Sequence, residues 1–168
     1  MTIPQRLLLL WVLTAAGCAS LLETKPARFK VDLSALDSVQ FIYHPGRSAA
    51  AGGAHPVRMD FGGSGYLEKL SGSSPRVLDP FWKQPDGAEW ADLRKEHRVL
   101  SRAETEAVYQ ALVDAGCFER GSTDAKPFTV ESPHVQILAA INGRKNVILT
   151  GEAPFLKIVR DLMARFQP

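Results

Sequence analysis

Apolar and polar residues alternate along several parts of the chain with the two-residue period of a β-strand. In the first of these parts, Val39, Phe41 and Tyr43 share one face of the expected strand. The last part is strongly charged but has the length of a strand, and we expect its polar side to face water. The strands predicted in this way are residues 37–44, 57–61, 66–70 and 94–100.

A helix is predicted to begin after Ser101. Ser101 and Glu104 have the spacing of a capping box, in which the hydroxyl accepts from the Glu104 amide and the carboxylate accepts from the Ser101 amide. Gly116 offers the left-handed conformation that ends many helices. Between these ends the apolar residues follow helical spacing and form one stripe: Ala107, Val108, Ala111, Leu112 and Ala115.

A β-hairpin is predicted for residues 134–150, because Asn142-Gly143 is the favoured pair for a two-residue type I′ turn. This turn places Ile137 opposite Ile148. Both faces of the hairpin carry apolar side chains, which predicts a place in the middle of a sheet or between two layers.

A second helix is expected to follow the hairpin, with Pro154 in its first turn. The order of elements predicts an α+β fold, an antiparallel β-sheet with two amphipathic helices packed on it. The apolar residues of this second helix recur at the spacing of one helix face: Phe155, Ile158, Val159, Leu162, Met163 and Phe166.

The N-terminus has the parts of a secretory signal, with Arg6 before the apolar run 7–13 and small residues behind it. The apolar run is about half the ~20 residues that a membrane-spanning helix needs. Ala15-Ala16-Gly17-Cys18 resembles the lipobox of bacterial lipoproteins, although that family most often has Leu where this chain has Ala15. The resemblance implies cleavage before Cys18, a diacylglyceryl group on the Cys18 thiol and an acyl chain, such as palmitate, on its amine.

The lipobox divides the chain into a signal peptide (1–17), a lipidated cysteine with a tether (18–36) and a single α+β domain (37–168). Ala19 rather than Asp follows the cysteine, which in the enterobacterial pattern implies release to the outer membrane. We therefore expect the protein in the bacterial cell envelope, held by the lipid on Cys18 and facing the periplasm or the cell surface. An ordinary secreted protein, with Cys18 near the cut by chance, is the alternative.

The charge of the mature chain is close to zero. The full chain has 20 Lys and Arg residues and 18 Asp and Glu residues. Arg6 is lost with the signal peptide, which leaves 19 basic residues against 18 acidic ones. The sequence has no basic stripe that would indicate a nucleic-acid partner. It also has no polybasic cluster that would indicate binding to anionic lipid. Cys117 has no disulfide partner once Cys18 is lipidated, and we expect it to be a buried small hydrophobe rather than a reactive thiol.

The sequence predicts no catalytic residue, no metal site and no cofactor. It contains no CxxC, HExxH or GxSxG motif. The glycine run 62–65 lacks the GxGxxG spacing and leads into a strand, so it predicts a bulge or a close backbone approach. The four histidines, His44, His55, His97 and His134, have no metal-ligand spacing. His44 and His55 flank one loop and are compatible with a weak metal contact, but solvated loop histidines are the favoured interpretation. An acidic stretch could supply paired carboxylates as in a glycosidase, with a solvated loop again favoured: Asp86, Glu89 and Asp92.

The segment 71–92 is the part of the domain that we expect to bind a partner. Its Pro and Gly residues exclude a regular element, and loops of this length are often functional. Phe81, Trp82 and Trp90 lie within it, and exposed aromatic side chains are typical interface anchors. The alternative is that these aromatics fold back and cap the sheet.

From Gly62 to Phe166 the order of elements resembles the emfourin-type domain of some secreted protease inhibitors. The matching features are the glycine run, the helix that closes on Gly116, the hairpin and the final helix. A long insertion at 71–92 and Ser132-Pro133-His134 at the entry to the hairpin depart from that pattern, so no inhibitory residue is carried over. The sequence favours a non-catalytic envelope lipoprotein that binds an envelope component. A tethered emfourin-like inhibitor of a protease is the alternative, and an enzyme is the least favoured class.

Overall fold

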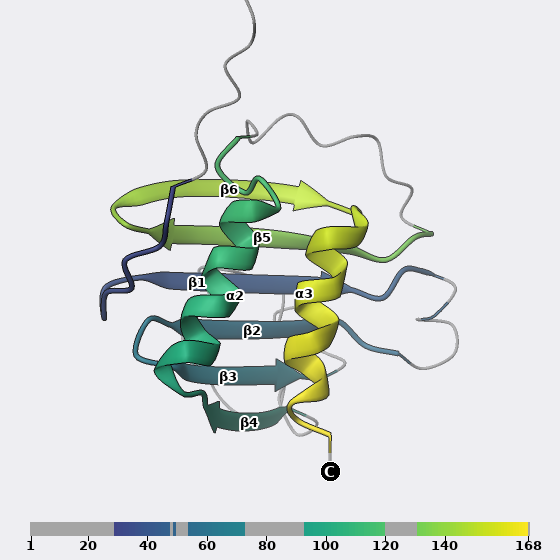
Figure 1. Ribbon diagram of the computed structural model, residues 1–168. Coiled ribbons are helices and arrows are strands. Elements are labelled where there is room, and N and C mark those ends of the chain that lie inside the picture. Colours follow the sequence, from purple (N-terminus) through teal and green to yellow (C-terminus); the bar gives the residue numbers. More distant parts are fainter. Residues whose placement is uncertain (1–28, 48, 50–53, 73–92, 120–130, 168) are drawn as a thin grey trace, which may run out of the picture.

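Within the residues that the computed structural model describes (29–47, 49, 54–72, 93–119 and 131–167), six antiparallel strands form one sheet, and two helices lie on one of its faces (Figure 1). The strand order is β4-β3-β2-β1-β5-β6. This arrangement confirms the predicted α+β class. The elements are β1 (Ser38–His44), β2 (Val57–Gly62), β3 (Tyr66–Ser71), β4 (Arg94–Val99), α2 (Arg102–Asp114), β5 (His134–Ile141), β6 (Arg144–Thr150) and α3 (Ala153–Ala164).

Strand β1 lies inside the sheet and pairs with β2 on one side and with β5 on the other. Phe41 is opposite both Met59 and Ile137, so three apolar side chains meet in one row on the helix face. All three are fully buried, and the alternation along each strand places every second residue on that face. The core between sheet and helices therefore follows from the two-residue period of the sequence.

Helix α2 has both of the predicted ends. Ser101 and Glu104 form the capping box. At the other end, Gly116 has a φ of +87°, and the Cys117 amide donates to the Leu112 carbonyl at 3.1 Å. These features form a Schellman motif, which satisfies carbonyl groups that the last helical turn leaves unpaired. Cys117 is buried, as expected for a small hydrophobe.

Helix α3 packs beside α2 on the same face of the sheet (Figure 1). Pro154 lies in its first turn, as predicted. The Arg165 guanidinium at its end donates to the Glu104 carboxylate at the start of α2, so the two helices are joined across the layer. The buried side chains of α3 are Phe155, Leu156, Val159 and Leu162.

The hairpin has the predicted register, with Ile137 opposite Ile148 and Ile141 opposite Arg144. Asn142 and Gly143 both have positive φ, as a type I′ turn requires. The expectation of a place in the middle of the sheet is wrong for β6, which forms the edge. One face of the hairpin packs on the helices, while Val147 on the other face is 41% exposed.

The glycine run 62–65 forms the turn between β2 and β3 and not a bulge. The predicted close backbone approach is found at Gly63, where a Cβ atom would lie 1.9 Å from the Ser34 carbonyl oxygen. Gly63 therefore allows the segment before β1 to pass directly over the turn.

The sequence predicts a tether over residues 18–36, but residues 29–36 lie against the domain. The Val31 amide donates to Gln110 of α2 at 2.9 Å, and both Val31 and Leu33 are buried. Asp37, only 4% exposed, accepts hydrogen bonds from the amides of Ser34 and Asn142 at 2.8 and 2.9 Å. We call residues 29–37 the N-terminal strap.

Within the described part of the chain, no helix has the length and apolar character needed to cross a membrane.

Candidate functional site

The face of the sheet that points away from the helices carries a shallow hollow. Its floor is a row of small residues on three neighbouring strands, because Ser38 of β1 is opposite Gly62 of β2 and Ala140 of β5. Larger side chains stand at the two ends of this row, Tyr66 on β3 and Lys145 on β6. The floor is low because the central positions carry almost no side-chain volume.

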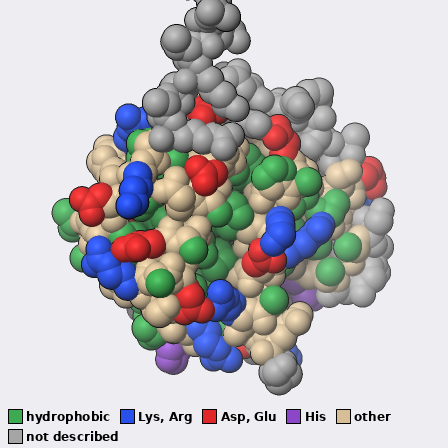
Figure 2. All heavy atoms as spheres, in the orientation of Figure 1, with side chains coloured by type: hydrophobic (Ala, Val, Ile, Leu, Met, Phe, Trp, Pro, Cys, Tyr) green, Lys and Arg blue, Asp and Glu red, His purple; other side chains and the backbone are tan. Residues whose placement is uncertain are grey.

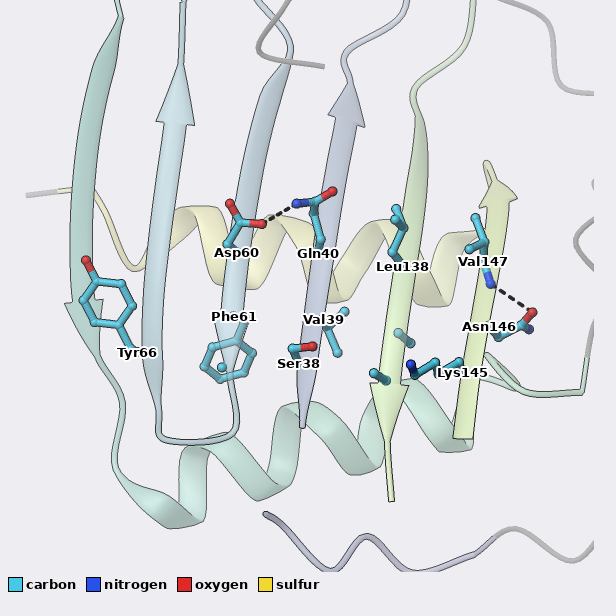
Figure 3. Close-up of a pocket in the computed structure, with 13 residues that line it drawn as sticks. Ser38, Val39, Gln40, Asp60, Phe61, Tyr66, Leu138, Lys145, Asn146 and Val147 are labelled. Carbon is cyan, nitrogen blue, oxygen red and sulfur yellow. Dashed lines mark hydrogen bonds between the residues drawn. The ribbon is translucent and has the colours of Figure 1, made fainter. Parts of the chain in front are cut away.

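A second row, one step further along the strands, forms a wall of the hollow. It runs from Asp60 on β2 through Gln40 on β1 and Leu138 on β5 to Val147 on β6 (Figure 3). The row is polar over β1 and β2 and apolar over β5 and β6. A ligand lying across the strands would therefore meet a different chemistry at each end.

The hollow has a volume of about 950 Å³, within the usual size of small-molecule sites, and apolar atoms make up most of its lining. Val39, Phe61 and Ala139 also contribute to the lining, although their side chains belong to the core on the helix side. Tyr66 is 43% exposed, so a sizeable aromatic surface at the rim is in contact with solvent. Exposed apolar surface of this kind is common at interaction sites.

The charges around the hollow are paired with one exception. The Asp60 carboxylate accepts from Gln40 Nε2 at 2.5 Å and from Arg58 Nε at 2.9 Å. Beyond the rim, Lys95 pairs with Glu68 at 2.8 Å. Among the described residues that line the hollow, Lys145 is the one charged side chain without an ion-pair partner.

The Lys145 side chain reaches from the edge strand toward the middle of the sheet. In Figure 3 it extends from β6 toward β5, with its nitrogen on the side of the hollow. The hollow thus combines apolar contact surface with one ammonium group that points over its floor.

Further along β1 and β3, the same face of the sheet is buried. Ile42 is completely buried and Leu70 is 6% exposed, although neither belongs to the core between sheet and helices. On β1 and β3, the accessible part of this face therefore lies at the end at which each strand begins.

Two of the four histidines lie together at the other end of β1. His44 and His134 are opposite each other in the register, and their rings stack with 4.6 Å between centroids and 9° between planes. Burial lowers the pKa of His44, and the nearby His134 lowers it further. His97 stacks on Tyr66 at 6.0 Å, whereas His55 is exposed. Within the described ranges, no three His, Cys, Asp or Glu side chains come together as a metal site would require.

The predicted site residues lie outside the described part of the chain. This holds for the lipidation site Cys18 and for Phe81, Trp82 and Trp90 of the expected binding loop. Both assignments stay predictions. The hollow was not predicted, because Gly62, Ser38 and Ala140 are far apart in the sequence; the one available signal was the small or polar alternate positions of the predicted strands.

No protein-family model matches the chain, and no curated protein is significantly similar to it in sequence.

Proposed function

We propose that this chain is a lipid-anchored, non-catalytic binding module of the bacterial cell envelope, and that its binding surface is the hollow on the open face of the sheet. The observation that carries the binding role is this accessible, mainly apolar hollow. The lipobox at residues 15–18 supports the anchor, and Ala19 supports the outer membrane as its location.

The two faces of the domain differ in a way that supports this assignment. On the face that carries α2 and α3, acidic and basic side chains are interspersed (Figure 2). Many of them pair locally, as Arg102 does with Glu106 and Lys157 with Asp161, both four residues apart. Such a surface is typical of a solvated face. The hollow instead exposes apolar atoms over small residues, which is a poor arrangement for solubility alone and a good one for contact.

The lipid would hold this surface near the membrane. A single acyl chain binds a bilayer only marginally, whereas two or more bind it stably, so a diacylated Cys18 needs no further membrane contact from the protein. Ten residues, 19–28, separate Cys18 from the strap, and at ~3.3 Å per residue they span at most about 33 Å. The domain would therefore act on partners close to the membrane surface.

The anchor is tested by metabolic labelling with palmitate in a bacterium that processes lipoproteins. The wild-type chain should incorporate the label and lose residues 1–17, while Cys18→Ala should do neither, because no other residue at this site can form the thioether. Label in the Cys18→Ala protein, or none in the wild type, would contradict the lipoprotein assignment.

The binding surface is tested by capture from detergent-solubilised envelopes with the lipidated protein. Ala140→Arg fills the floor of the hollow, and Ala164→Arg makes the same change on an exposed position at the end of α3. Components that the wild type and Ala164→Arg retain but Ala140→Arg loses would support the hollow as the binding surface. Equal capture by all three folded proteins would rule it out.

A further inference from the structure

We propose that the hollow binds a fatty-acid-type anion, with the apolar chain lying across the strands over Ser38 and Ala140 and the carboxylate on the Lys145 ammonium. This inference rests on the proposed function, because it names the ligand of the same hollow.

The floor fits a narrow apolar chain. Gly62, Ser38 and Ala140 lie side by side on β2, β1 and β5, and Tyr66 and Lys145 stand one strand further out on either side. Four strand spacings of roughly 4.8 Å give the row a length of about 19 Å. A chain of medium length can lie along this row with its sides against the small residues.

The charges select an anion. Asp60 is the one carboxylate in the described lining, and Arg58 and Gln40 already satisfy it. Lys145 remains as the one cation in that lining without an ion-pair partner. A carboxylate placed beside Lys145 would gain a charge-assisted hydrogen bond, whereas a cationic head group there would be repelled.

The position of Lys145 explains how one ligand reaches both features. Lys145 is opposite Ala140 in the register, and its side chain extends from β6 toward β5 and the floor of the hollow (Figure 3). An acid bound at Lys145 therefore has its chain directed onto the small residues. On the far side of the floor, the exposed ring of Tyr66 closes the row with an apolar surface.

The test uses the lipidated full-length protein in detergent micelles and two photoreactive probes, decanoate and decanol with the same diazirine group. Cross-linked peptides are mapped by mass spectrometry, so probe that merely partitions into the micelle does not count as binding. We expect decanoate to label β1, β5 and β6 around the hollow. Lys145→Glu should reduce this labelling by about tenfold, the effect of losing a contact of roughly 1.4 kcal/mol, while decanol labelling changes by less than about twofold.

Lys145→Met and Lys157→Glu complete the design. Lys145→Met removes only the charge of an exposed side chain, so its folding is not at risk, and it should weaken decanoate labelling in the same direction. Lys157→Glu makes the matched charge reversal on α3, and it should change neither probe. Three results would each overturn the proposal. Both probes could label the hollow equally, the Lys145 substitutions could leave decanoate labelling unchanged, or decanoate could label only other surfaces.

Two further outcomes separate this proposal from neighbouring ones. If a photoreactive phospholipid labels the hollow and decanoate does not, the ligand is a lipid of the bilayer, and the proposal of a free fatty acid is wrong. If Ala140→Arg loses an envelope component but decanoate never labels the hollow, the ligand class is wrong and the proposed function stands. If Ala140→Arg captures everything that the wild type does, the proposed function itself fails.

Discussion

Replacing Asp37 with Ala is expected to cost about 3–5 kcal/mol of unfolding free energy, because its buried carboxylate joins the N-terminal strap to the hairpin turn, which is 105 residues away in the sequence. One carboxylate oxygen accepts from the Asn142 amide in the hairpin turn and the other from the Ser34 amide in the strap. The Asp37 backbone carbonyl also accepts from the Gly63 amide at 2.7 Å, a hydrogen bond that Ala would keep. Hydrogen bonds to a charged group contribute about 1.5–3 kcal/mol each, and Ala would leave two N–H donors without acceptors.

The measurement is urea unfolding followed by far-ultraviolet circular dichroism. Small domains have about 5–15 kcal/mol of stability in total, so the expected loss should shift the midpoint strongly. Asp37→Asn keeps one acceptor oxygen and should lose about half as much. Asp32→Ala is the control, because Asp32 is exposed and its hydrogen bonds to Asn142 come from its backbone; it should change stability by less than about 0.5 kcal/mol. A loss below about 1 kcal/mol for Asp37→Ala would refute the idea that this carboxylate fastens the strap.

Four further predictions concern the core and the titrating groups. Leu112→Asp and Ile137→Asp should each unfold the domain, because both side chains are fully buried and an unpaired buried carboxylate costs several kcal/mol; cooperative melting at the wild-type temperature would contradict this core assignment. Hydrogen bonds from Arg165 and then from Ser101 lower the pKa of Glu104 to about 2, so its contribution to stability is complete above pH 4.5 and is lost between pH 4.5 and about 2. Arg165→Met should flatten this part of the stability curve, and an unchanged curve would exclude the ion pair as its cause. The pKa of His44 is lowered by burial and by His134, so stability should fall as the pH drops below 6.5, and His44→Phe should reduce that fall in thermal melts. Burial raises the pKa of the Cys117 thiol to about 12, so a thiol reagent at pH 8 should react only after the protein is unfolded in denaturant; rapid reaction of the native protein would show that Cys117 is accessible.

The elements that could be predicted from the sequence are those with strong local signals. The capping box at Ser101 and Glu104, a signal only four residues long, defines the start of α2, and Gly116 defines its end. Asn142-Gly143 determines the register of the hairpin because a two-residue turn fixes which residues face each other. In each case the interactions that stabilise the element are made between residues close in the sequence, so the element can be predicted without knowledge of the remaining fold.

The strand order and the strap depend on contacts between distant segments and could not be predicted. The Val31 amide bonds to Gln110, 79 residues away, and Asp37 bonds to Asn142, 105 residues away. Nothing in the local pattern of residues 29–36 indicates these partners, so the segment had the composition of a tether. The apolar outer face of the hairpin likewise gave no sign that β6 forms the edge of the sheet, because exposed and buried apolar residues look alike in a sequence.

The hollow likewise depends on residues from distant parts of the chain, which the sheet brings together on its surface. Exposed positions of a sheet usually carry long or charged side chains, which keep the sheet soluble and prevent it from pairing with other chains. Strand β4 follows this rule on the open face at Lys95 and His97, although Val99 on the same face is 73% exposed. On the central strands Gln40 and Asp60 follow this rule, whereas Leu138 does not. The strongest departure is the row in which the registers align Gly62, Ser38 and Ala140. A small residue at one such position is unremarkable, but three in a row lower the surface across neighbouring strands and leave apolar atoms accessible. Lys145, which could have covered this row as part of an ion pair, instead has no such partner among the described residues. The combination is better explained by contact with a ligand than by solubility, and substitutions at Ala140 and Lys145 test that explanation directly.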